Sequence, residues 1–156
     1  MIFSLGSNLG DKLLNLKEAK KNLDGCFDYQ DATDIFETDP VEFEDQPKFL
    51  NQLVQYEYPG DNPEQILDLV KNIEIKLGRT ETFDKGPRII DIDIIFINDL
   101  KYHSSKLSIP HPEVFNRDFV LCLLPNLKIF PKLQEWFGVE EKENIFPLVK
   151  KLSDNL

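Results

Sequence analysis

One segment in the second half of the chain constrains the fold more than any other feature, because it alternates bulky apolar residues with carboxylates. Residues 89–97 read Ile-Ile-Asp-Ile-Asp-Ile-Ile-Phe-Ile. Successive side chains of a β-strand point to opposite faces. One face is then a continuous apolar surface directed to the core, made of Ile90, Ile92, Ile94 and Phe96. The opposite face carries Asp91 and Asp93, roughly 6.6 Å apart at about 3.3 Å per residue.

The two aspartates admit two interpretations. They can face water on an ordinary amphipathic strand, because this short pattern is common. Alternatively they bind cations, since two like charges flanked by isoleucines repel each other and resist desolvation. Two carboxylates on one strand can bridge a pair of magnesium ions, which sit about 3.5–4 Å apart in two-metal sites. Arg88, in a Gly-Pro-Arg turn just upstream and suited to a phosphate oxygen, favours the metal site.

The order of elements predicts a small antiparallel sheet. Strands are expected at 2–5, 27–36, 49–58 and 89–97. Helices are expected at 11–25, 62–78, 116–124 and 144–152. Gly25 and Gly78 are the expected C-terminal caps, and Asn62 with Pro63 marks a helix start. The β-α-β-β-α-β order up to residue 97 predicts a ferredoxin-like α+β fold with additional C-terminal helices, an arrangement that hosts many functions.

Length and charge limit the function classes. A chain of 156 residues suits a single domain spanning 1–156. The net charge of −10 argues against nucleic acid as a partner, although a small anion such as ATP can bind where cations and metal invert the local sign. No run approaches the roughly 20 apolar residues of a membrane span. Cys26 and Cys122 lack metal-ligand spacing and are expected to be buried, reduced thiols, so we expect a cytoplasmic protein without membrane contact.

Five motifs resemble one enzyme family in order and spacing. Gly86-Pro87-Arg88 followed by Asp91-Ile92-Asp93-Ile94 resembles the signature G-P-R-x-x-D-[IL]-D-[IL] of 6-hydroxymethyl-7,8-dihydropterin pyrophosphokinase, a family of folate biosynthesis. The other four matches are Gly6-Ser7-Asn8-Leu9-Gly10, Asp45-Gln46-Pro47-Lys48-Phe49-Leu50-Asn51, Ile73-Glu74 through Gly78-Arg79, and Pro110-His111-Pro112 with Asn116-Arg117-Asp118-Phe119. Together they cover residues 1 to about 125, and the family's fold is also ferredoxin-like.

The resemblance implies a role for each matching residue. Asp91 and Asp93 match the ligands of two Mg²⁺ ions, and with Arg79 and Arg88 they form the catalytic set. The pterin alcohol would stack between Phe49 and Phe119 and would pair with Asn51 and with backbone groups of Thr38 and Val41. The ATP set matches Glu74, expected at the ribose, with Arg79, Arg88, His111 and Arg117 at the phosphates. The adenine region matches Ile94, Leu107 and Ser108.

Without the resemblance several of these residues have plainer interpretations. Phe49 and Phe119 would be core aromatics, and Glu74 a solvated carboxylate beside its helix's apolar stripe. His111 between two prolines is equally a turn residue or a phosphate donor, and the arginines would be surface charges. Two departures from the family pattern are Ile89, where threonine is frequent, and Lys85, where some members carry tryptophan.

The implied reaction transfers pyrophosphate from ATP to the pterin hydroxyl and releases AMP. The resemblance leaves open whether the chain is fused to, or associated with, another folate-pathway enzyme. Two alternatives from other classes stay open. One is a ferredoxin-like binding or regulatory domain that holds nucleotide without catalysis, although the intact aspartate pair and arginines argue against it. The other is a different magnesium-dependent phosphotransferase, which would release ADP.

Overall fold

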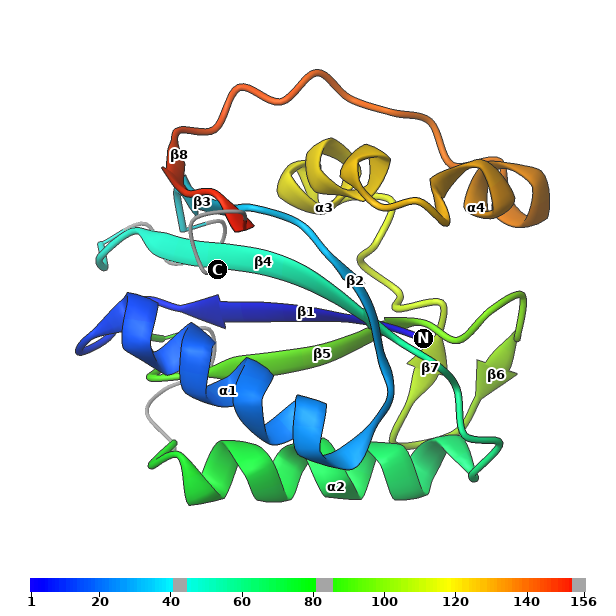
Figure 1. The fold of residues 1–156 in the computed structure, drawn as a ribbon, viewed down its shortest axis with the longest axis horizontal. Helices are drawn as coiled ribbons and strands as arrows, with labels where there is room; N and C mark the ends of the chain where they lie inside the picture. The colour runs from blue at the N-terminus through cyan, green and yellow to red at the C-terminus, as the bar shows by residue number, and fades with distance from the viewer. Residues whose placement is uncertain (41–44, 81–85, 153–156) are drawn as a thin grey trace.

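The computed structural model describes residues 1–40, 45–80 and 86–152, which form an antiparallel sheet with helices on both sides (Figure 1). Val41 and Lys85, both named from the sequence, lie outside the described residues. In chain order the elements are β1 (Ile2–Ser7), α1 (Lys12–Cys26), β2 (Tyr29–Ala32), β3 (Ile35–Thr38), β4 (Phe49–Tyr56), α2 (Pro63–Lys76), β5 (Asp91–Phe96), β6 (Tyr102–His103), β7 (Ser108–Ile109), α3 (Asp118–Leu123), the 3₁₀ turn η1 (Leu124–Asn126), α4 (Phe130–Phe137) and β8 (Leu148–Lys150).

The main sheet has the strand order β5-β1-β4-β3-β8, and β2 also pairs with β4. Every neighbouring pair of strands in it is antiparallel. The register places Gly6 of β1 opposite Asn51 of β4 on one side and opposite Asp91 of β5 on the other. A Cβ atom on Gly6 would lie 3.0 Å from Asn51 Oδ1, so a larger residue here would require the Asn51 side chain to shift by a few tenths of an ångström. The register therefore brings two predicted site residues into one row across three strands.

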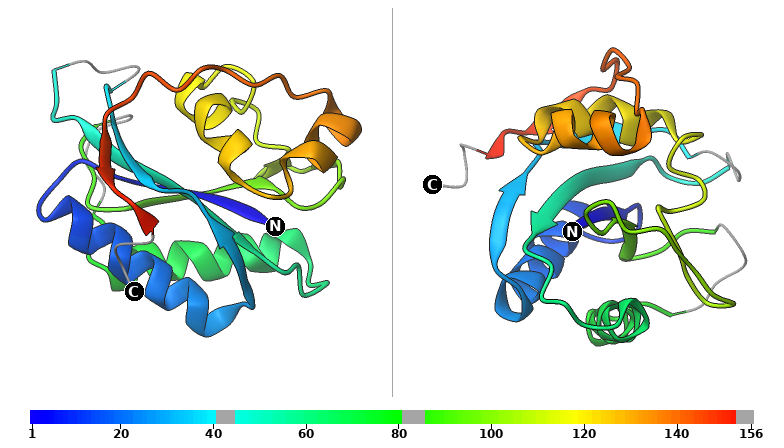
Figure 2. Two further views of the ribbon diagram at one scale, coloured as in Figure 1. Left: turned by 45° about the horizontal axis from the view of Figure 1, so that its top comes forward. Right: turned by 90° about the vertical axis from the view of Figure 1, so that its right-hand side faces the viewer.

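Two apolar clusters hold the helices against the two faces of the sheet. The cluster under α1 and α2 includes Leu16, Leu23, Ile66 and Val70. The second cluster joins α3, η1 and α4 to the opposite face through Val120, Leu124 and Leu133. Figure 2 shows the sheet between these two helical layers.

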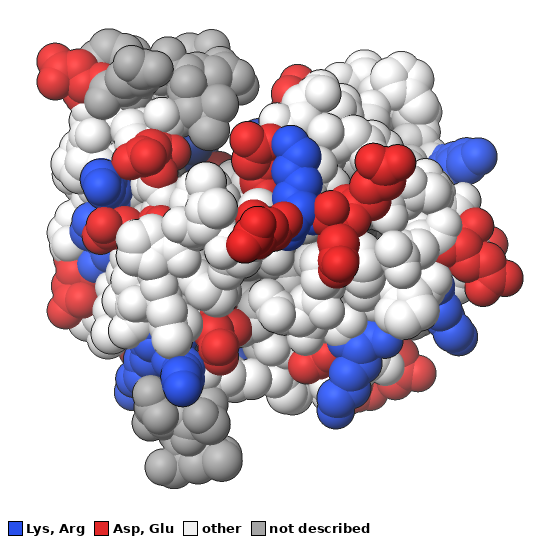
Figure 3. Space-filling view, turned by 90° about the horizontal axis from the view of Figure 1, so that it is seen from above, with Lys and Arg blue, Asp and Glu red and all other residues white. Residues whose placement is uncertain are grey.

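The surface on the side of α3 and α4 carries charges of both signs. Seen from that side, acidic and basic side chains are interspersed (Figure 3).

β5 follows the predicted alternation over most of its length. Ile90, Ile92 and Ile94 belong to the cluster beneath α1 and α2, as predicted. Phe96 does not, because it packs in the second cluster, with its ring centroid 5.4 Å from that of Phe137. A register shift opposite Ile2 and Phe3 interrupts the alternation there. The prediction for Phe96 was therefore wrong, since a bulge reverses the faces that follow it.

The structure confirms both predicted ends of α2 and corrects the predicted end of α1. Asn62 caps α2 by accepting a hydrogen bond from the Glu64 amide at 2.9 Å, and Gly78 follows the helix with a left-handed φ of 95°. Gly25 is not a cap, because α1 continues through it to Cys26. The Phe27 amide instead donates to Leu23 O, and the chain passes straight towards β2 without a left-handed residue.

The C-terminal part differs most from the prediction. The expected helix at 144–152 is absent from its described residues, and the helix of this region lies earlier, at α4. Pro147 cannot donate within a helix, and its carbonyl accepts from the Glu37 amide at 2.9 Å. β8 then pairs with β3 as a further strand. Cys122 is buried but Cys26 is exposed, contrary to expectation. In the described ranges there is no helix of the length and apolar character that crossing a membrane requires.

Candidate active site

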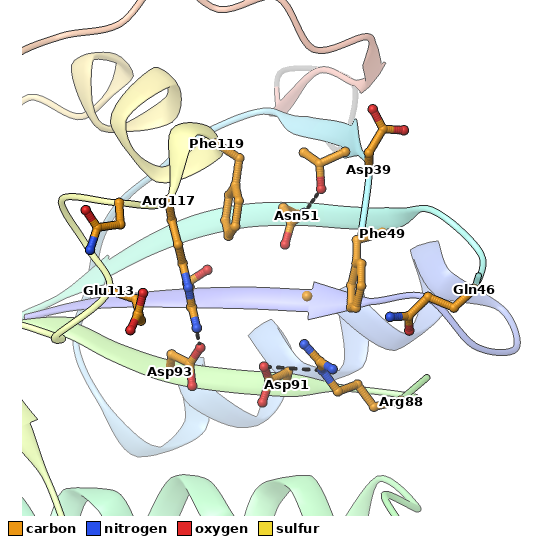
Figure 4. Close-up of a pocket in the computed structure, with 14 residues that line it drawn as sticks. Asp39, Gln46, Phe49, Asn51, Arg88, Asp91, Asp93, Glu113, Arg117 and Phe119 are labelled. Atoms are coloured by element: carbon orange, nitrogen blue, oxygen red, sulfur yellow. Dashed lines mark hydrogen bonds and ion pairs between the residues drawn. The ribbon is translucent and has the colours of Figure 1, made fainter. Parts of the chain in front are cut away.

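A cavity of about 110 Å³ lies over the centre of the sheet, between β5, β4 and the start of α3. Its walls bring together residues that are far apart in the sequence, from Ser4 to Phe119, as Figure 4 shows. The predicted site residues that line it are Thr38, Phe49, Asn51, Arg88, Asp91, Asp93, Arg117 and Phe119. The aspartates and the two phenylalanines therefore share one cavity, which is the arrangement that the metal-site interpretation requires.

The two phenyl rings project into this cavity from separate elements. Phe49 begins β4 and is buried, whereas Phe119 lies in the first turn of α3 and is partly buried. Figure 4 shows the rings on opposite sides of the cavity, with Asn51 between them. Asn51 donates one amide hydrogen to Thr38 Oγ1, which orients its side chain. A flat heterocycle between two rings and beside an amide would have both stacking and hydrogen-bonding partners.

Asp91 is held by two arginines. Arg79 Nη1 donates to Asp91 Oδ1 at 2.8 Å, and Arg88 Nε lies 3.4 Å from Asp91 Oδ2. Burial opposes ionisation of this carboxylate, but the attraction of Arg88 and Arg79 outweighs it and lowers the pKa of Asp91. Asp91 is therefore an anion at neutral pH and can act as a ligand for a cation.

Asp93 has a different partner, although it shares the same side of β5. Arg117 Nη1 donates to Asp93 Oδ2 at 3.0 Å. The two aspartate side chains are similarly accessible, at 20% for Asp91 and 22% for Asp93. The charges are thus neutralised separately, which removes much of the repulsion between them.

A pair of carboxylates suits magnesium better than metals that need a closed protein cage. Mg²⁺ commonly binds one or two carboxylates and completes its shell with water and substrate phosphates. Across residues 1–40, 45–80 and 86–152 no three His, Cys, Asp or Glu side chains gather in a way that could hold a metal ion.

Glu74 lies below the cavity rather than in its wall. It is 2% exposed, and its Oε2 accepts from both Arg79 Nη1 and the Ile92 amide, at 2.5 and 2.9 Å. Lys71 lies 3.2 Å from the other oxygen, Oε1. Burial raises the pKa of Glu74 despite these donors. The Glu74 carboxylate thus holds Arg79 against Asp91 from within the protein.

A second cavity, of about 410 Å³, lies beside the first. Its lining includes the predicted adenine and phosphate residues Ile94, Leu107, Ser108 and His111. Asp93 lines both cavities, so it marks the point where they meet. The larger volume and the strand-edge backbone of the β6–β7 hairpin suit a nucleoside.

His111 is held in a defined orientation at this second cavity. Its amide donates to Ile95 O at 2.9 Å, and its Nδ1 accepts from the Glu113 amide at 3.1 Å. Burial, assisted by the positive charge of Arg117, lowers the pKa of His111 although Asp93 opposes the shift. The imidazole is therefore neutral at pH 7, and its proton lies on Nε2, from which it can donate to an anionic oxygen.

The structure brings most predicted site residues to one of the two cavities, while Glu74 and Arg79 line neither. The functional roles of all of them stay predictions. Sequence reasoning missed several lining residues, namely Ser4, Gly6, Asp39, Gln46, Glu113 and Asn116 in the first cavity and Lys71 in the second. Ser4 and Gly6 alternate along β1 towards the same face, a period-two signal that would have identified them once β1 was placed beside β5.

Comparison with known proteins gives relatives of two kinds, a pyrophosphokinase of similar length and much longer folate-synthesis proteins. The chain is 38% identical over 126 residues to the 2-amino-4-hydroxy-6-hydroxymethyldihydropteridine pyrophosphokinase of Bacillus subtilis, which covers 80% of this chain and 75% of the relative. It is also 40% identical to the folic acid synthesis protein FOL1 of Dictyostelium discoideum and 39% identical to a mitochondrial folate synthesis bifunctional protein of Pisum sativum. These matches cover 80% and 81% of the chain but span only 19% and 25% of the two longer proteins.

Solved structures agree on the fold. A crystal structure of the HPPK-DHPS protein of Plasmodium falciparum has a TM-score of 0.64, with 16% identity, over 98% of this chain and 42% of that one. At this identity the likeness concerns the fold alone. The sequence model of the 7,8-dihydro-6-hydroxymethylpterin-pyrophosphokinase family matches residues 2–129. That match and the 38% identity to the Bacillus subtilis enzyme show that the chain belongs to the 7,8-dihydro-6-hydroxymethylpterin-pyrophosphokinase (HPPK) family.

Proposed function

We propose that this chain transfers the pyrophosphate group of ATP to the hydroxyl of 6-hydroxymethyl-7,8-dihydropterin, giving AMP and the pterin pyrophosphate. One observation carries the proposal: Asp93 lines both the cavity walled by Phe49 and Phe119 and the adjoining larger cavity. An acceptor in the first cavity and a nucleotide in the second would meet at this carboxylate. The name of the Bacillus subtilis relative, a hydroxymethyldihydropteridine pyrophosphokinase, supports the same acceptor and transferred group.

The smaller cavity is the proposed pterin site. The two phenyl rings would stack on the faces of the heterocycle, while Asn51 and Thr38 pair with its amide edge. Val41 is proposed to offer a backbone group, although it lies outside the described residues. Two aromatic walls and directed polar groups between them suit a flat, polar heterocycle.

The larger cavity is the proposed nucleotide site. Adenine would lie against the β6–β7 hairpin near Ile94, Leu107 and Ser108, with its phosphates towards Asp93. Glu74 is 2% exposed with both oxygens paired, which favours a role in holding Arg79 over the contact with ribose that the resemblance implies. Lys71 lines this cavity and offers a further positive charge.

Magnesium is the proposed cofactor. Asp91 and Asp93 would hold two Mg²⁺ ions together with phosphate oxygens of ATP, and the ions would neutralise phosphate charge and favour the ionised form of the acceptor hydroxyl. Arg79 and Arg88 neutralise Asp91, and Arg117 neutralises Asp93. Arg88 and Arg117 line the cavity and can exchange a carboxylate for a phosphate oxygen, a geometry for which guanidinium is well suited.

The protein's own contribution to the reaction is to position the substrates and neutralise charge, since phosphoryl-type transfer requires little covalent help. The pterin hydroxyl oxygen forms a bond to the β-phosphorus as the bond from that phosphorus to the α–β bridging oxygen breaks. AMP leaves with that oxygen, and the hydroxyl loses its proton. Arg88, Arg117 and neutral His111 would donate to the phosphate oxygens, and Asp91 or Asp93 would accept the proton that the hydroxyl loses.

The proposal also covers the topology, the domain organisation, the cellular setting and the association of the chain. The strand order β5-β1-β4-β3 supports a ferredoxin-like topology, and the two clusters about one sheet support a single domain over 1–156. A cytoplasmic setting is supported by the two unpaired thiols. Association or fusion with a second folate-synthesis enzyme is proposed because one relative is named a bifunctional protein.

The decisive experiment identifies the nucleotide product. The chain is incubated with MgCl₂, ATP and 6-hydroxymethyl-7,8-dihydropterin, and the nucleotides are separated by ion-exchange chromatography. AMP formed in equal amount to the pterin pyrophosphate is the expected result. ADP would identify a different phosphotransferase, and ATP binding without turnover would identify a nucleotide-binding domain; either result would overturn the proposal.

A further inference from the structure

Asn8 follows β1 and is a polar residue that the protein has buried almost completely, at 1% exposure. A buried amide destabilises the fold unless its donors and acceptors are paired. The backbone amide, the Nδ2 group and the Oδ1 atom of Asn8 are all hydrogen-bonded within the described structure. Their partners come from two segments that are distant in the sequence. Asn8 itself lines neither cavity.

The first set of partners is the backbone of Arg88. The Arg88 amide donates to Asn8 Oδ1 at 2.9 Å, and the Asn8 amide donates to Arg88 O at 3.2 Å. These two bonds fix the backbone from which the Arg88 side chain reaches Asp91. They therefore fix the position of the Arg88 guanidinium, which belongs to the proposed phosphate side of the site.

The second set of partners lies on the pterin side. Asn8 Nδ2 donates to Gln46 Oε1 at 2.8 Å and to Pro47 O at 3.0 Å. Gln46 lines the smaller cavity, and Phe49 begins β4 two residues after Pro47. The same amide group thus fixes the segment that leads into one wall of the proposed pterin site.

We propose that Asn8 is a positioning residue that sets the distance between the phosphate side and the pterin side of the site. This inference rests on the proposed function. Transfer depends on the approach of the hydroxyl oxygen to the β-phosphorus, and misplacement by about 1 Å can cost roughly 100-fold in rate. Most contacts of each ligand alone, in contrast, come from residues that Asn8 does not hold, namely Asn51, Thr38 and Phe119 for the pterin and the lining of the larger cavity for the nucleotide. Loss of Asn8 therefore lowers kcat while leaving the affinity for each substrate alone nearly unchanged.

Two variants separate the two sets of bonds. Asn8→Ala removes all three side-chain bonds but keeps the bond from its amide to Arg88 O. Asn8→Asp keeps the shape and the acceptor for the Arg88 amide, but it places a carboxylate oxygen against Pro47 O. A carboxylate cannot donate, so the bond to Pro47 O is lost while the bond from the Arg88 amide is kept. Asn8→Asp therefore removes the link to Pro47 without removing the link to Arg88.

Asn15→Ala is the matched control. Asn15 Nδ2 donates to Leu9 O at 2.9 Å and to Ser7 Oγ at 3.2 Å, so it supports the same turn without contacting Arg88 or Pro47. For each protein we would measure kcat, the Kd for the pterin alone, the Kd for a non-hydrolysable ATP analogue with magnesium, and the Tm. These four quantities distinguish lost positioning from lost folding or lost binding.

The expected result is a kcat roughly 10- to 100-fold lower in both Asn8 variants, with each Kd within about threefold of wild type. Asn15→Ala is expected to keep kcat within about threefold. An unchanged kcat, an equal loss in Asn15→Ala, or a loss of affinity as large as the loss of kcat would overturn the inference. Should Asn8→Ala fail to fold, Asn8→Asp alone decides by the same criteria. A wild-type protein that forms no AMP would overturn the proposed function instead.

Discussion

The guanidinium carbon of Arg88 lies 4.8 Å from the centre of the Phe49 ring, so a cation on the phosphate side of the site rests on an aromatic wall of the pterin side. Arg88 Nε is buried and has no hydrogen-bond partner within the described structure, although Asp91 Oδ2 is 3.4 Å away. A buried donor without a good acceptor is costly, and a phosphate oxygen would satisfy it. The two halves of the site are thus in direct contact through Arg88 and Phe49.

Removal of Asp93 should abolish transfer without unfolding the protein. Asp93→Ala deletes the carboxylate that both cavities share, and Arg117, which loses its partner, is partly exposed to water. We expect no measurable AMP and a Tm within a few degrees of wild type, because a partly exposed ion pair contributes little to stability. The control is Asp99→Ala, an exposed carboxylate just beyond β5. Near-normal turnover of Asp93→Ala with magnesium would refute the metal assignment.

Truncation of one aromatic wall should weaken pterin binding. Phe119→Ala removes a ring that lines the smaller cavity, and the expected loss is about 1–3 kcal/mol of pterin affinity. Titration calorimetry with the pterin alone measures it. Phe115→Ala is the matched control, because Phe115 belongs to the same segment, is 49% exposed and does not line this cavity. Equal pterin affinity in wild type and Phe119→Ala would exclude the stacking site.

Loss of Arg79 should destabilise the fold as well as the site. Arg79→Met leaves Glu74, which is 2% exposed, beside Asp91 without the guanidinium that joins them. The expected decrease in the free energy of unfolding is roughly 1–3 kcal/mol, because a buried carboxylate loses a charged donor. The control is Lys48→Met, because the ion pairs of Lys48 are exposed and 3.6–3.9 Å long. This variant should change the free energy of unfolding by less than about 0.5 kcal/mol. Urea unfolding of both variants would test the prediction, and equal effects would contradict it.

His111 should make stability depend on pH below neutrality. Its pKa is lowered by burial, so the folded state disfavours the imidazolium form that the unfolded chain readily takes up. By linkage, the effect of His111 on the free energy of unfolding is constant above the unfolded-state pKa of about 6.5. As pH falls below that value the unfolded chain takes up the proton first, so the free energy of unfolding decreases.

Substitution of His111 tests this directly. In His111→Gln the decrease in unfolding free energy between pH 7.5 and 5.5 should be smaller than in wild type, and the difference between the two proteins isolates His111 from other titrating groups. His103→Gln is the control, because His103 is exposed. An identical pH dependence in wild type and His111→Gln would show that burial of His111 does not affect its ionisation.

Much of the fold could be predicted because the signals were local. The cap at Asn62, the glycine after α2 and the alternation through Ile90, Ile92 and Ile94 all depend on residues within one turn or a few strand positions. The errors arose where a distant partner decided the outcome. Phe96 changed face at a bulge opposite β1, and Pro147 joined the edge of the sheet beside β3 instead of lying in a helix.

The residues themselves determined that two carboxylates would stand on one side of a strand, with an arginine turn before it and family-typical motifs around it. Only the tertiary structure decided that Glu74 is buried beneath the site, that Asp93 joins two cavities, and that Asn8 links segments that are far apart along the chain. The physical reason is that strand periodicity is a property of neighbouring residues. Burial and hydrogen bonding between distant segments depend on how the whole sheet and its helices pack.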